Sequence, residues 1–447
     1  MPRSLPRASA PLTGAVVVPG DKSVSHRAAL FALLASGPCR ASGWLASADT
    51  LASLDAVAAL GARIARDGDR ILVDAAAAPA ACLRAGDEPL LIDCRNSGTT
   101  ARLLCGLLAG WLPPGGPGVV LDGDASLRGR PMSRVVAPLC AMGARIEWLG
   151  TEGRLPLRVR GAALHGVVHT LPVPSAQLKS ALLLAGLHAD GETVIDGGGS
   201  SRDHSERLLT AMGAAPRPGP GDRLAVRARR GLAPYDLAVP ADPSTAAFFQ
   251  VAAAMVPGSR LTVHGQALGP GRTGALDVLR AAGAEVLIER SAPADDPARE
   301  PAGRVTVGAG PLRAFTVGAD AVPGLVDELP VLAVLATACA GTTVISGAQE
   351  LRVKESDRIA LMARGLRALG AELEERPDGL VIHGPTALRG GTPAAPVRHE
   401  TGGDHRIAMA LAVAALIAEG DSALDDPDCV AVSFPEFFPT LDDLLDR

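Results

Sequence analysis

The stretch PSAQLKSALLLAGLHADGETVIDG, residues 174–197, contains a short pattern that recurs along the whole chain. A polar start leads into an Ala- and Leu-rich helix, a glycine follows, and a β-prone run leads to another turn. Five other segments repeat this order: LLASGPCRASG (33–43), WLPPGGPGVVLDG (111–123), AMVPGSRLTVHG (254–265), ACAGTTVISG (338–347) and IAEGDSALDD (417–426). Six such copies predict a repeated α/β unit in which the helix ends at the glycine.

Each copy has one marker glycine, and these six form the first series: Gly37, Gly118, Gly191, Gly258, Gly341 and Gly420. They are nearly evenly spaced, at intervals of 67 to 83 residues. A second glycine lies between them, where an amphipathic helix closes before a strand, as a C-cap glycine allows. These second glycines are Gly61, Gly143, Gly213, Gly283 and Gly370. The spacing predicts six units of about 75 residues, each with two helices and several short strands. One such unit cannot bury its apolar faces alone, so the copies must pack on one another.

The composition indicates a folded cytoplasmic protein of at least two domains. A chain of 447 residues is too long for one ordinary core. A net charge of −5 and 2% aromatic residues argue against nucleic acid as a partner. The start lacks an apolar signal region, and apolar stretches such as residues 407–418 are shorter than the roughly 18 residues of a membrane span. Seven cysteines without a CxxC pair fit free thiols in a reducing compartment.

Rare residue types gather where the apolar helices begin. Only three of the 43 basic residues are lysines, and Asn96 is the only asparagine. The polar clusters at these starts are DKSVSHR (21–27), NSGTT (96–100), PSAQ (174–177), DPS (242–244), DELP (327–330) and TGGDHR (401–406). Ordinary capping explains any one of them. Together they predict a shared polyanionic ligand, because a helix N-terminus offers unpaired N–H groups and partial positive charge.

The three lysines differ in their surroundings. Lysine carries a compact charge with a tunable pKa, whereas arginine is a permanently charged planar fork. In an arginine-rich chain, Lys22 and Lys354 therefore indicate sites that the planar guanidinium of arginine does not suit, since both lie among polar and charged neighbours. Lys179 comes one turn into an apolar helix, so we expect it only to support the site.

Two other motifs are weak signals. GPGRTG at 269–274 matches GxGxxG but lacks the expected strand and acidic partner, so we interpret it as a turn. HGVVH at 165–169 has no glutamate or third ligand nearby, and a strand or turn pair explains it better than a metal site.

The polar clusters, read in chain order, resemble the 5-enolpyruvylshikimate-3-phosphate synthase family. The resemblance rests on PGDKSVSHR, RNSGTTARLL, GRP, PSAQLKSALLLAG, SRDHSE, PADPSTAAF, DELPVLAV, ELRVKESDR and GGDHRIAMA, which run from about residue 19 to 440. PSAQ and LRVKESDR are closer to the second class of the family.

The resemblance implies an inside-out α/β barrel of two domains, each with three βαβαββ repeats and with the site between them. By analogy one domain spans 22–239 and the other combines 1–21 with 240–447, with crossover hinges near 20–22 and 239–242.

The resemblance also implies the reaction. Phosphoenolpyruvate and shikimate 3-phosphate give the enolpyruvyl ether and free phosphate, with no metal or organic cofactor. Residues carried over by motif bind shikimate 3-phosphate: Lys22, Ser23, Arg27, Ser175, Ala176, Gln177, Arg202, Asp327 and Lys354, with Ser201 near its phosphate. Those for phosphoenolpyruvate are Lys22, Gly98, Arg130, Gln177, Arg358 and Arg406. Asp327 would accept the 5-hydroxyl proton and Glu355 would exchange protons at C3, a role that Lys22 would share.

Two positions depart from the first class of the family. Val432 stands where that class has a phosphoenolpyruvate-binding lysine, and Ala176 replaces a second serine. Position 98 is glycine, which leaves this place without a side chain. The resemblance therefore implies inhibition by glyphosate, which competes for the phosphoenolpyruvate site. It also implies weaker inhibition of the Gly98→Ala variant.

Two other functions stay open. The sister transferase that acts on UDP-N-acetylglucosamine uses a loop cysteine, whereas DGDASLRGRPMS (122–133) has none. A non-catalytic repeat protein that binds phosphorylated metabolites would explain the helix starts but not the carboxylates Asp327 and Glu355 beside Lys354 and Arg358. We expect small-molecule substrates, no nucleic acid or membrane, and a monomer.

Overall fold

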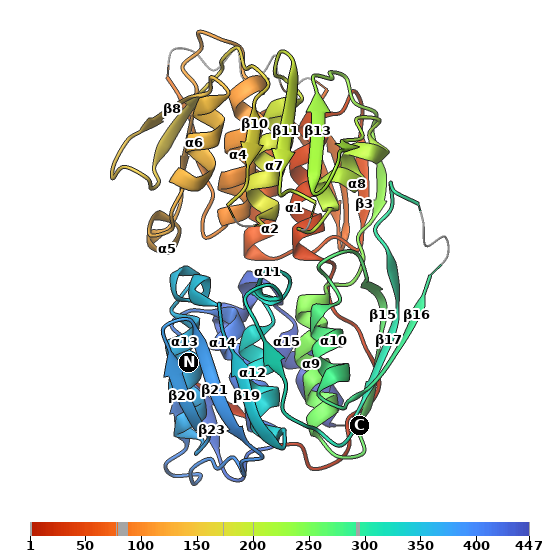
Figure 1. Cartoon of the computed structure of the whole chain (residues 1–447), viewed down its shortest axis with the longest axis vertical. Coiled ribbons are helices and arrows are strands. Elements are labelled where there is room, and N and C mark those ends of the chain that lie inside the picture. The colour runs from red at the N-terminus through yellow and green to blue at the C-terminus, as the bar shows by residue number, and fades with distance from the viewer. Residues whose placement is uncertain are drawn as a thin grey trace. The chain divides into compact units, whose positions relative to one another are not determined.

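The computed structural model describes residues 2–76, 78, 88–172, 174–199, 201–291 and 296–446. The chain divides into two compact units (Figure 1). The first, called here the 20–240 unit, consists of Gly20–Pro240 and Asp295–Glu300. The second, called the 241–447 unit, consists of Met1–Pro19, Ala241–Ala294 and Pro301–Arg447.

The 20–240 unit contains three four-stranded sheets of one design among its described residues. In each sheet the first two strands are parallel and the remaining pairs are antiparallel. The sheet order β14-β3-β5-β4 uses Asp236–Ala238, Cys39–Ser42, Arg70–Asp74 and Arg63–Asp67. The order β6-β7-β9-β8 uses Leu90–Asp93, Val119–Asp122, Leu157–Arg160 and Arg145–Trp148. The order β10-β11-β13-β12 uses Val168–Thr170, Glu192–Asp196, Arg223–Arg227 and Arg217–Pro218.

The helices of this unit follow the strands in a regular alternation. They are α1 (Lys22–Leu30), η1 (Phe31–Leu34), α2 (Ala48–Ala59), α4 (Gly98–Trp111), α5 (Ala125–Arg128), α6 (Ser133–Ala141), α7 (Ala176–Gly186) and α8 (His204–Ala211). The second repeat therefore runs β6, α4, β7, α6, β8, β9, with the short α5 before α6, and the third runs β10, α7, β11, α8, β12, β13.

The 241–447 unit repeats the design twice and shortens it once. The order β16-β17-β15-β2 uses Glu285–Arg290, Ala302–Gly308, Arg260–Ala267 and Thr13–Val16. The order β18-β19-β21-β20 uses Thr316–Val317, Gly341–Ile345, Gly379–Gly384 and Glu372–Arg376. The last sheet, β1-β23-β22, has three strands: Arg3–Leu5, Ser422–Leu424 and Val397–His399. The sixth repeat thus differs from the predicted βαβαββ order, because the N-terminal strand β1 takes the antiparallel place beside β23.

The helices of this unit are α9 (Pro243–Met255), α10 (Gly274–Ala281), α11 (Val322–Leu325), α12 (Leu329–Ala338), η2 (Gln349–Val353), α13 (Arg358–Ala368), α14 (His405–Ala415), η3 (Asp428–Val432) and α15 (Phe437–Leu445). Helices α9, α12 and α14 pack against one another. Every residue of α9 and α14 is buried. Beyond their polar first residues both sequences are almost entirely apolar, which is typical of a helix surrounded by protein.

The central helices of the 20–240 unit pack in the same way. Helix α4 contacts both α1 and α7, and most of its residues are buried. An added Cβ at Gly106 would lie 2.1 Å from the carbonyl oxygen of Ala181, so α4 and α7 approach closely only because this position is glycine.

The glycine pattern is partly confirmed. All five second-series glycines have positive φ, from 81° at Gly213 to 98° at Gly283, and each follows the last residues of a helix. The first series was placed wrongly, because its glycines lie three to seven residues beyond the helix ends, at the entries to the strands. For example, α4 ends at Trp111, whereas Gly118 directly precedes β7. Gly37 also lacks the positive φ of the other five.

Gly106→Ala should destabilise the protein. Alanine favours a helix over glycine by about 1 kcal/mol, but forcing a methyl group against a fixed backbone costs about 1–3 kcal/mol or more. We expect a lower unfolding midpoint in urea. Gly116→Ala is the control, since its added Cβ would meet nothing nearer than 3.7 Å. Equal midpoints for the two variants would refute the close approach of α4 and α7.

Candidate functional site

The start of α1 places Lys22 beside a carboxylate. Asp21 caps the helix by accepting a hydrogen bond from the backbone N–H of Val24. Lys22 is the first helical residue, and its Nζ lies 3.0 Å from Oδ2 of Asp49 in the first turn of α2. The two side chains are 18% and 10% exposed. The ammonium group of Lys22 is therefore held by a carboxylate, while part of the lysine side chain remains exposed to solvent.

Arg27 is buried one turn further along α1. Its Nε donates to Oγ of Ser205 at 2.8 Å, its Nη2 to Oγ of Ser180 at 2.7 Å, and its Nη1 to the carbonyl of Ser23 at 2.9 Å. Burial lowers the pKa of this guanidinium to about 10, an effect that the carboxylate of Glu206 opposes. The group stays charged at neutral pH and is held by hydroxyl groups from α7 and α8.

The first turns of α4 and α7 are joined by hydrogen bonds. Nη1 of Arg102 donates to Oε1 of Gln177 at 2.7 Å, and Nε2 of Gln177 donates to the hydroxyl of Thr99 at 2.9 Å. A Cβ at Gly98 would lie 2.8 Å from Nη1 of Arg102 and 3.5 Å from Nη1 of Arg130. The N-terminus of α4 thus has two buried guanidinium groups beside it, an arrangement suited to an anion.

Asn96 orients one of these guanidinium groups. Its carbonyl oxygen accepts a hydrogen bond from Nη2 of Arg130 at 2.6 Å, and its Nδ2 donates to Asp124 at 2.8 Å. The only asparagine of the chain therefore uses both ends of its amide, one as acceptor and one as donor, which neither aspartate nor leucine could do.

The start of α7 contains the remaining predicted residues of this unit. Ser175 caps the helix by accepting from the N–H of Leu178, and Ala176 is its first residue. Arg202 is half-buried, two residues before α8. The predicted ligands from the 20–240 unit are thus in, or directly before, the first turns of α1, α4, α7 and α8. The exceptions are Arg27, in the second turn of α1, and Arg130, which follows α5.

In the 241–447 unit, Arg358 lies among three carboxylates. Its Nε donates to Oδ2 of Asp404 at 2.8 Å and its Nη2 to Oε2 of Glu355 at 2.5 Å, while Nη1 is 3.7 Å from Oδ1 of Asp327. The arginine is 1% exposed. Burial alone would lower its pKa, but the carboxylates of Asp404 and Glu355 outweigh that effect and raise it. Its buried Nη1 makes no hydrogen bond within the described residues.

Asp327 is held between two arginines. Nε of Arg406 lies 3.5 Å from its Oδ1, and Nη1 of Arg406 donates to its backbone carbonyl at 2.9 Å. Asp404 caps α14 by accepting from the N–H of Arg406. The starts of α12, α13 and α14 are therefore joined by ion pairs, and Asp327 keeps 22% of its side chain exposed.

Lys354 and Glu355 lie between η2 and α13. Lys354 pairs with Glu350 at 3.2 Å and is 25% exposed, so this lysine is more accessible than Lys22. Glu355 is 18% exposed and contacts Arg358, and a carboxylate so placed remains close to both solvent and fixed positive charge.

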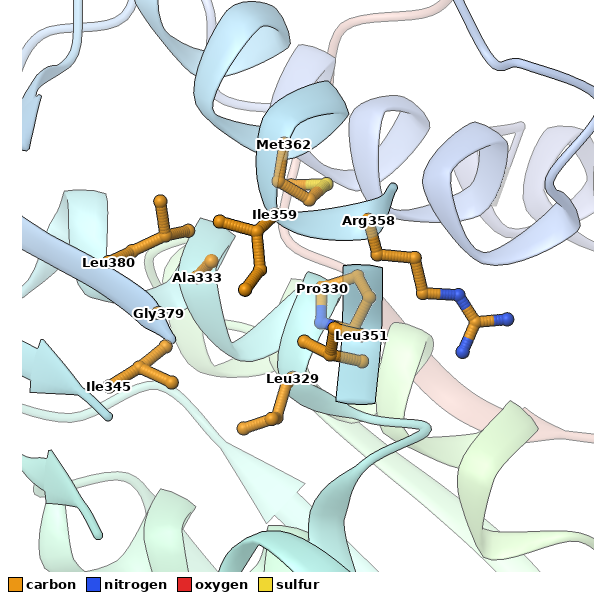
Figure 2. Close-up of a pocket in the computed structure, with 10 residues that line it drawn as sticks. All are labelled: Leu329, Pro330, Ala333, Ile345, Leu351, Arg358, Ile359, Met362, Gly379 and Leu380. Carbon is orange, nitrogen blue, oxygen red and sulfur yellow. The ribbon is translucent and has the colours of Figure 1, made fainter. Parts of the chain in front are cut away.

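An apolar pocket lies behind this cluster. Leu329 and Pro330 from the start of α12, Leu351 from η2 and Ile359 from α13 line it together with the stem of Arg358. Figure 2 shows the guanidinium of Arg358 pointing away from these aliphatic side chains. Because the side chain of Arg358 is only 1% exposed, its ion pairs are stronger than they would be in water.

Three neighbours of the predicted residues were missed. Arg102 comes one turn after Gly98, so helical spacing could have indicated it. Asp404 lies two residues before Arg406 in the GGDHR motif, which was also an available signal. Asp49 gave no signal, because its contact with Lys22 depends on the packing of α1 against α2.

Comparison with known proteins identifies the family. The model of EPSP synthase (3-phosphoshikimate 1-carboxyvinyltransferase) matches residues 6–441. The chain belongs to this family. The 3-phosphoshikimate 1-carboxyvinyltransferase of Synechococcus sp. (strain WH7803) is 48% identical over 439 residues, which cover 97% of this chain and 96% of that protein. That of Anaeromyxobacter sp. (strain K) is 48% identical over 438 residues, covering 98% and 94%.

Solved EPSP synthase structures share the fold. The 2.37 Å structure of EPSP synthase from Acinetobacter baumannii has a TM-score of 0.82 and 34% identity, covering 99% of this chain and 97% of that one. The predicted two-domain α/β fold class is thereby confirmed. Across the described part of this EPSP synthase family member, no helix is long and apolar enough to cross a membrane. The six described cysteines are free, and Cys82 lies outside the described residues.

Proposed function

We propose that the protein transfers the enolpyruvyl group of phosphoenolpyruvate to the 5-hydroxyl of shikimate 3-phosphate. The protein is a transferase of the EPSP synthase family, and the observation that carries the reaction is the family match over residues 6–441. The 5-hydroxyl oxygen bonds to C2 of phosphoenolpyruvate while C3 gains a proton. The tetrahedral intermediate then expels phosphate as C3 loses a proton, which restores the double bond.

The helix-start clusters would bind the substrates. Each substrate carries a phosphate and a carboxylate, and two unit charges 4 Å apart repel by about 4 kcal/mol at an effective dielectric near 20. Fixed cations offset this repulsion. Our assignment for shikimate 3-phosphate is Lys22, Ser23, Arg27, Ser175, Ala176, Gln177, Arg202, Asp327 and Lys354. Our assignment for phosphoenolpyruvate is Lys22, Gly98, Arg130, Gln177, Arg358 and Arg406, with Arg102 added because of its place beside Gly98.

Three groups would move protons. Asp327 would take the 5-hydroxyl proton, since its carboxylate is partly exposed and lies between Arg358 and Arg406. Glu355 would exchange protons at C3, and Lys22 would share that role. Groups that give and take protons work best with a pKa near the working pH, which neighbouring charges can adjust.

Phosphate release tests the proposal against its alternatives. Purified protein is mixed with phosphoenolpyruvate and either shikimate 3-phosphate or UDP-N-acetylglucosamine. We expect phosphate release with shikimate 3-phosphate and none with UDP-N-acetylglucosamine. Release with the sugar nucleotide would favour the sister transferase, and binding of shikimate 3-phosphate without release would favour a non-catalytic binding protein.

The Gly98→Ala substitution should weaken inhibition by glyphosate. The added methyl group would lie only 2.8 Å from Nη1 of Arg102 and in ordinary contact with Nη1 of Arg130. We assign both arginines to the phosphoenolpyruvate subsite, where glyphosate competes. We expect the inhibition constant to rise at least about tenfold, equal to about 1.4 kcal/mol. Gly116→Ala should leave the inhibition constant unchanged, since its Cβ would meet nothing nearer than 3.7 Å. An unaltered inhibition constant in Gly98→Ala would contradict the assignment.

We further propose that the enzyme is a cytoplasmic monomer that needs neither metal nor organic cofactor, and that it belongs with the second class of the family. Gel filtration with light scattering tests the oligomeric state. Activity that survives dialysis against a chelator tests the independence from metal.

A further inference from the structure

Lys179, the third lysine, forms a buried ion pair on α7. Its side chain is fully buried, and its Nζ lies 2.6 Å from Oε1 of Glu206 on α8 and 3.2 Å from the carbonyl of Ser201. Burying an ion pair is costly, and apolar residues of similar volume often replace such a pair without loss of stability. Packing alone therefore does not explain this pair.

The first segment that the pair holds is the turn before Arg202. The ammonium group of Lys179 donates to the carbonyl of Ser201, and the hydroxyl of Ser201 donates to the carbonyl of Gly198 at 3.2 Å. An added Cβ at Gly198 would also contact the stem of Lys179 at 3.4 Å. Lys179 thus fixes the backbone that leads into Arg202.

The second segment is the first turn of α8. Glu206 follows Ser205, whose hydroxyl accepts from Nε of Arg27 and exchanges a hydrogen bond with Oγ of Ser180 at 2.6 Å. Burial raises the pKa of the Glu206 carboxyl, and Lys179 opposes that effect, so loss of the lysine would leave a buried carboxylate unpaired. The carboxylate of Glu206 in turn supports the charge of Arg27.

We propose that Lys179 and Glu206 are positioning residues for the phosphate end of shikimate 3-phosphate. The pair holds Arg202 through Ser201 and holds Arg27 through Ser205, while touching no substrate itself. This inference rests on the proposed function, because that function assigns Arg27 and Arg202 to shikimate 3-phosphate.

The test separates the phosphate from the rest of the substrate. In Lys179→Met we expect KM for shikimate 3-phosphate to rise at least tenfold while KM for phosphoenolpyruvate changes by less than twofold. Calorimetric binding of shikimate 3-phosphate should weaken by a similar factor, and binding of unphosphorylated shikimate should not. A parallel loss for both ligands would show a general distortion and overturn the proposal.

Further variants keep the test decisive. Lys179→Met/Glu206→Met removes the unpaired carboxylate and should fold, yet still bind shikimate 3-phosphate at least tenfold more weakly. Leu184→Ala, on the same helix and fully buried, should lower stability without changing either KM. Wild-type affinity in the folded double variant, or failure of every pair variant to fold, would assign the pair to stability alone. Absence of turnover in the wild-type protein would instead refute the proposed function.

Discussion

Replacing Arg358 with methionine is expected to reduce phosphate release by about 10²–10³-fold or more and to lower stability by about 3–5 kcal/mol. The arginine contacts both Asp404 and Glu355, and Asp404 is fully buried. Without the guanidinium, the buried Asp404 and the partly exposed Glu355 would both lose this counter-charge. The predicted phosphoenolpyruvate subsite would also lose a permanent charge.

Two measurements check this expectation. Steady-state phosphate release gives the catalytic effect, and urea unfolding gives the stability. Arg364→Ala is the matched control, because Arg364 lies on the same helix but is 62% exposed and pairs with the exposed Glu400. It should behave as wild type. A stable, active Arg358→Met variant would remove Arg358 from both roles.

Lys22→Ala is expected to reduce phosphate release at least about 10³-fold while leaving the protein folded. Lys22 is proposed to bind both substrates and to take part in proton exchange at C3. Its loss should change stability by about 1 kcal/mol or less, since the pair with Asp49 is partly exposed. Asp49 also remains in the first turn of α2, where the helix N-terminus stabilises its charge.

Lys22→Arg separates charge from proton transfer. The guanidinium of arginine keeps the positive charge, but its pKa is too high for it to exchange protons near neutral pH. We therefore expect activity to stay at least about tenfold below wild type. Arg63→Ala, at a surface position 84% exposed, serves as the control for a lost cation. Full activity of Lys22→Ala would exclude Lys22 from the mechanism.

The sequence predicted the helix starts because capping is local. Asp242 and Pro243 begin α9 as expected, and Ser175 and Asp404 cap their helices through bonds to N–H groups two or three residues away. The sequence could not place the helix ends of the first glycine series, because the turn between helix and strand has no fixed length. It also did not indicate that β1 would close the sixth sheet, since its partner β23 lies more than 400 residues away.

The residue types at the site were decided by the sequence, and their partners by the tertiary structure. The scarcity of lysine and asparagine indicated Lys22, Lys354 and Asn96, because composition is visible along the chain. The partner of Arg358 is 46 residues away and that of Arg102 is 75 residues away. Such pairs form only when separate repeats stack their helices, and stacking depends on apolar packing over the whole unit. The sequence therefore determined where the polar helix starts occur, whereas only the fold decided which charges each of them holds.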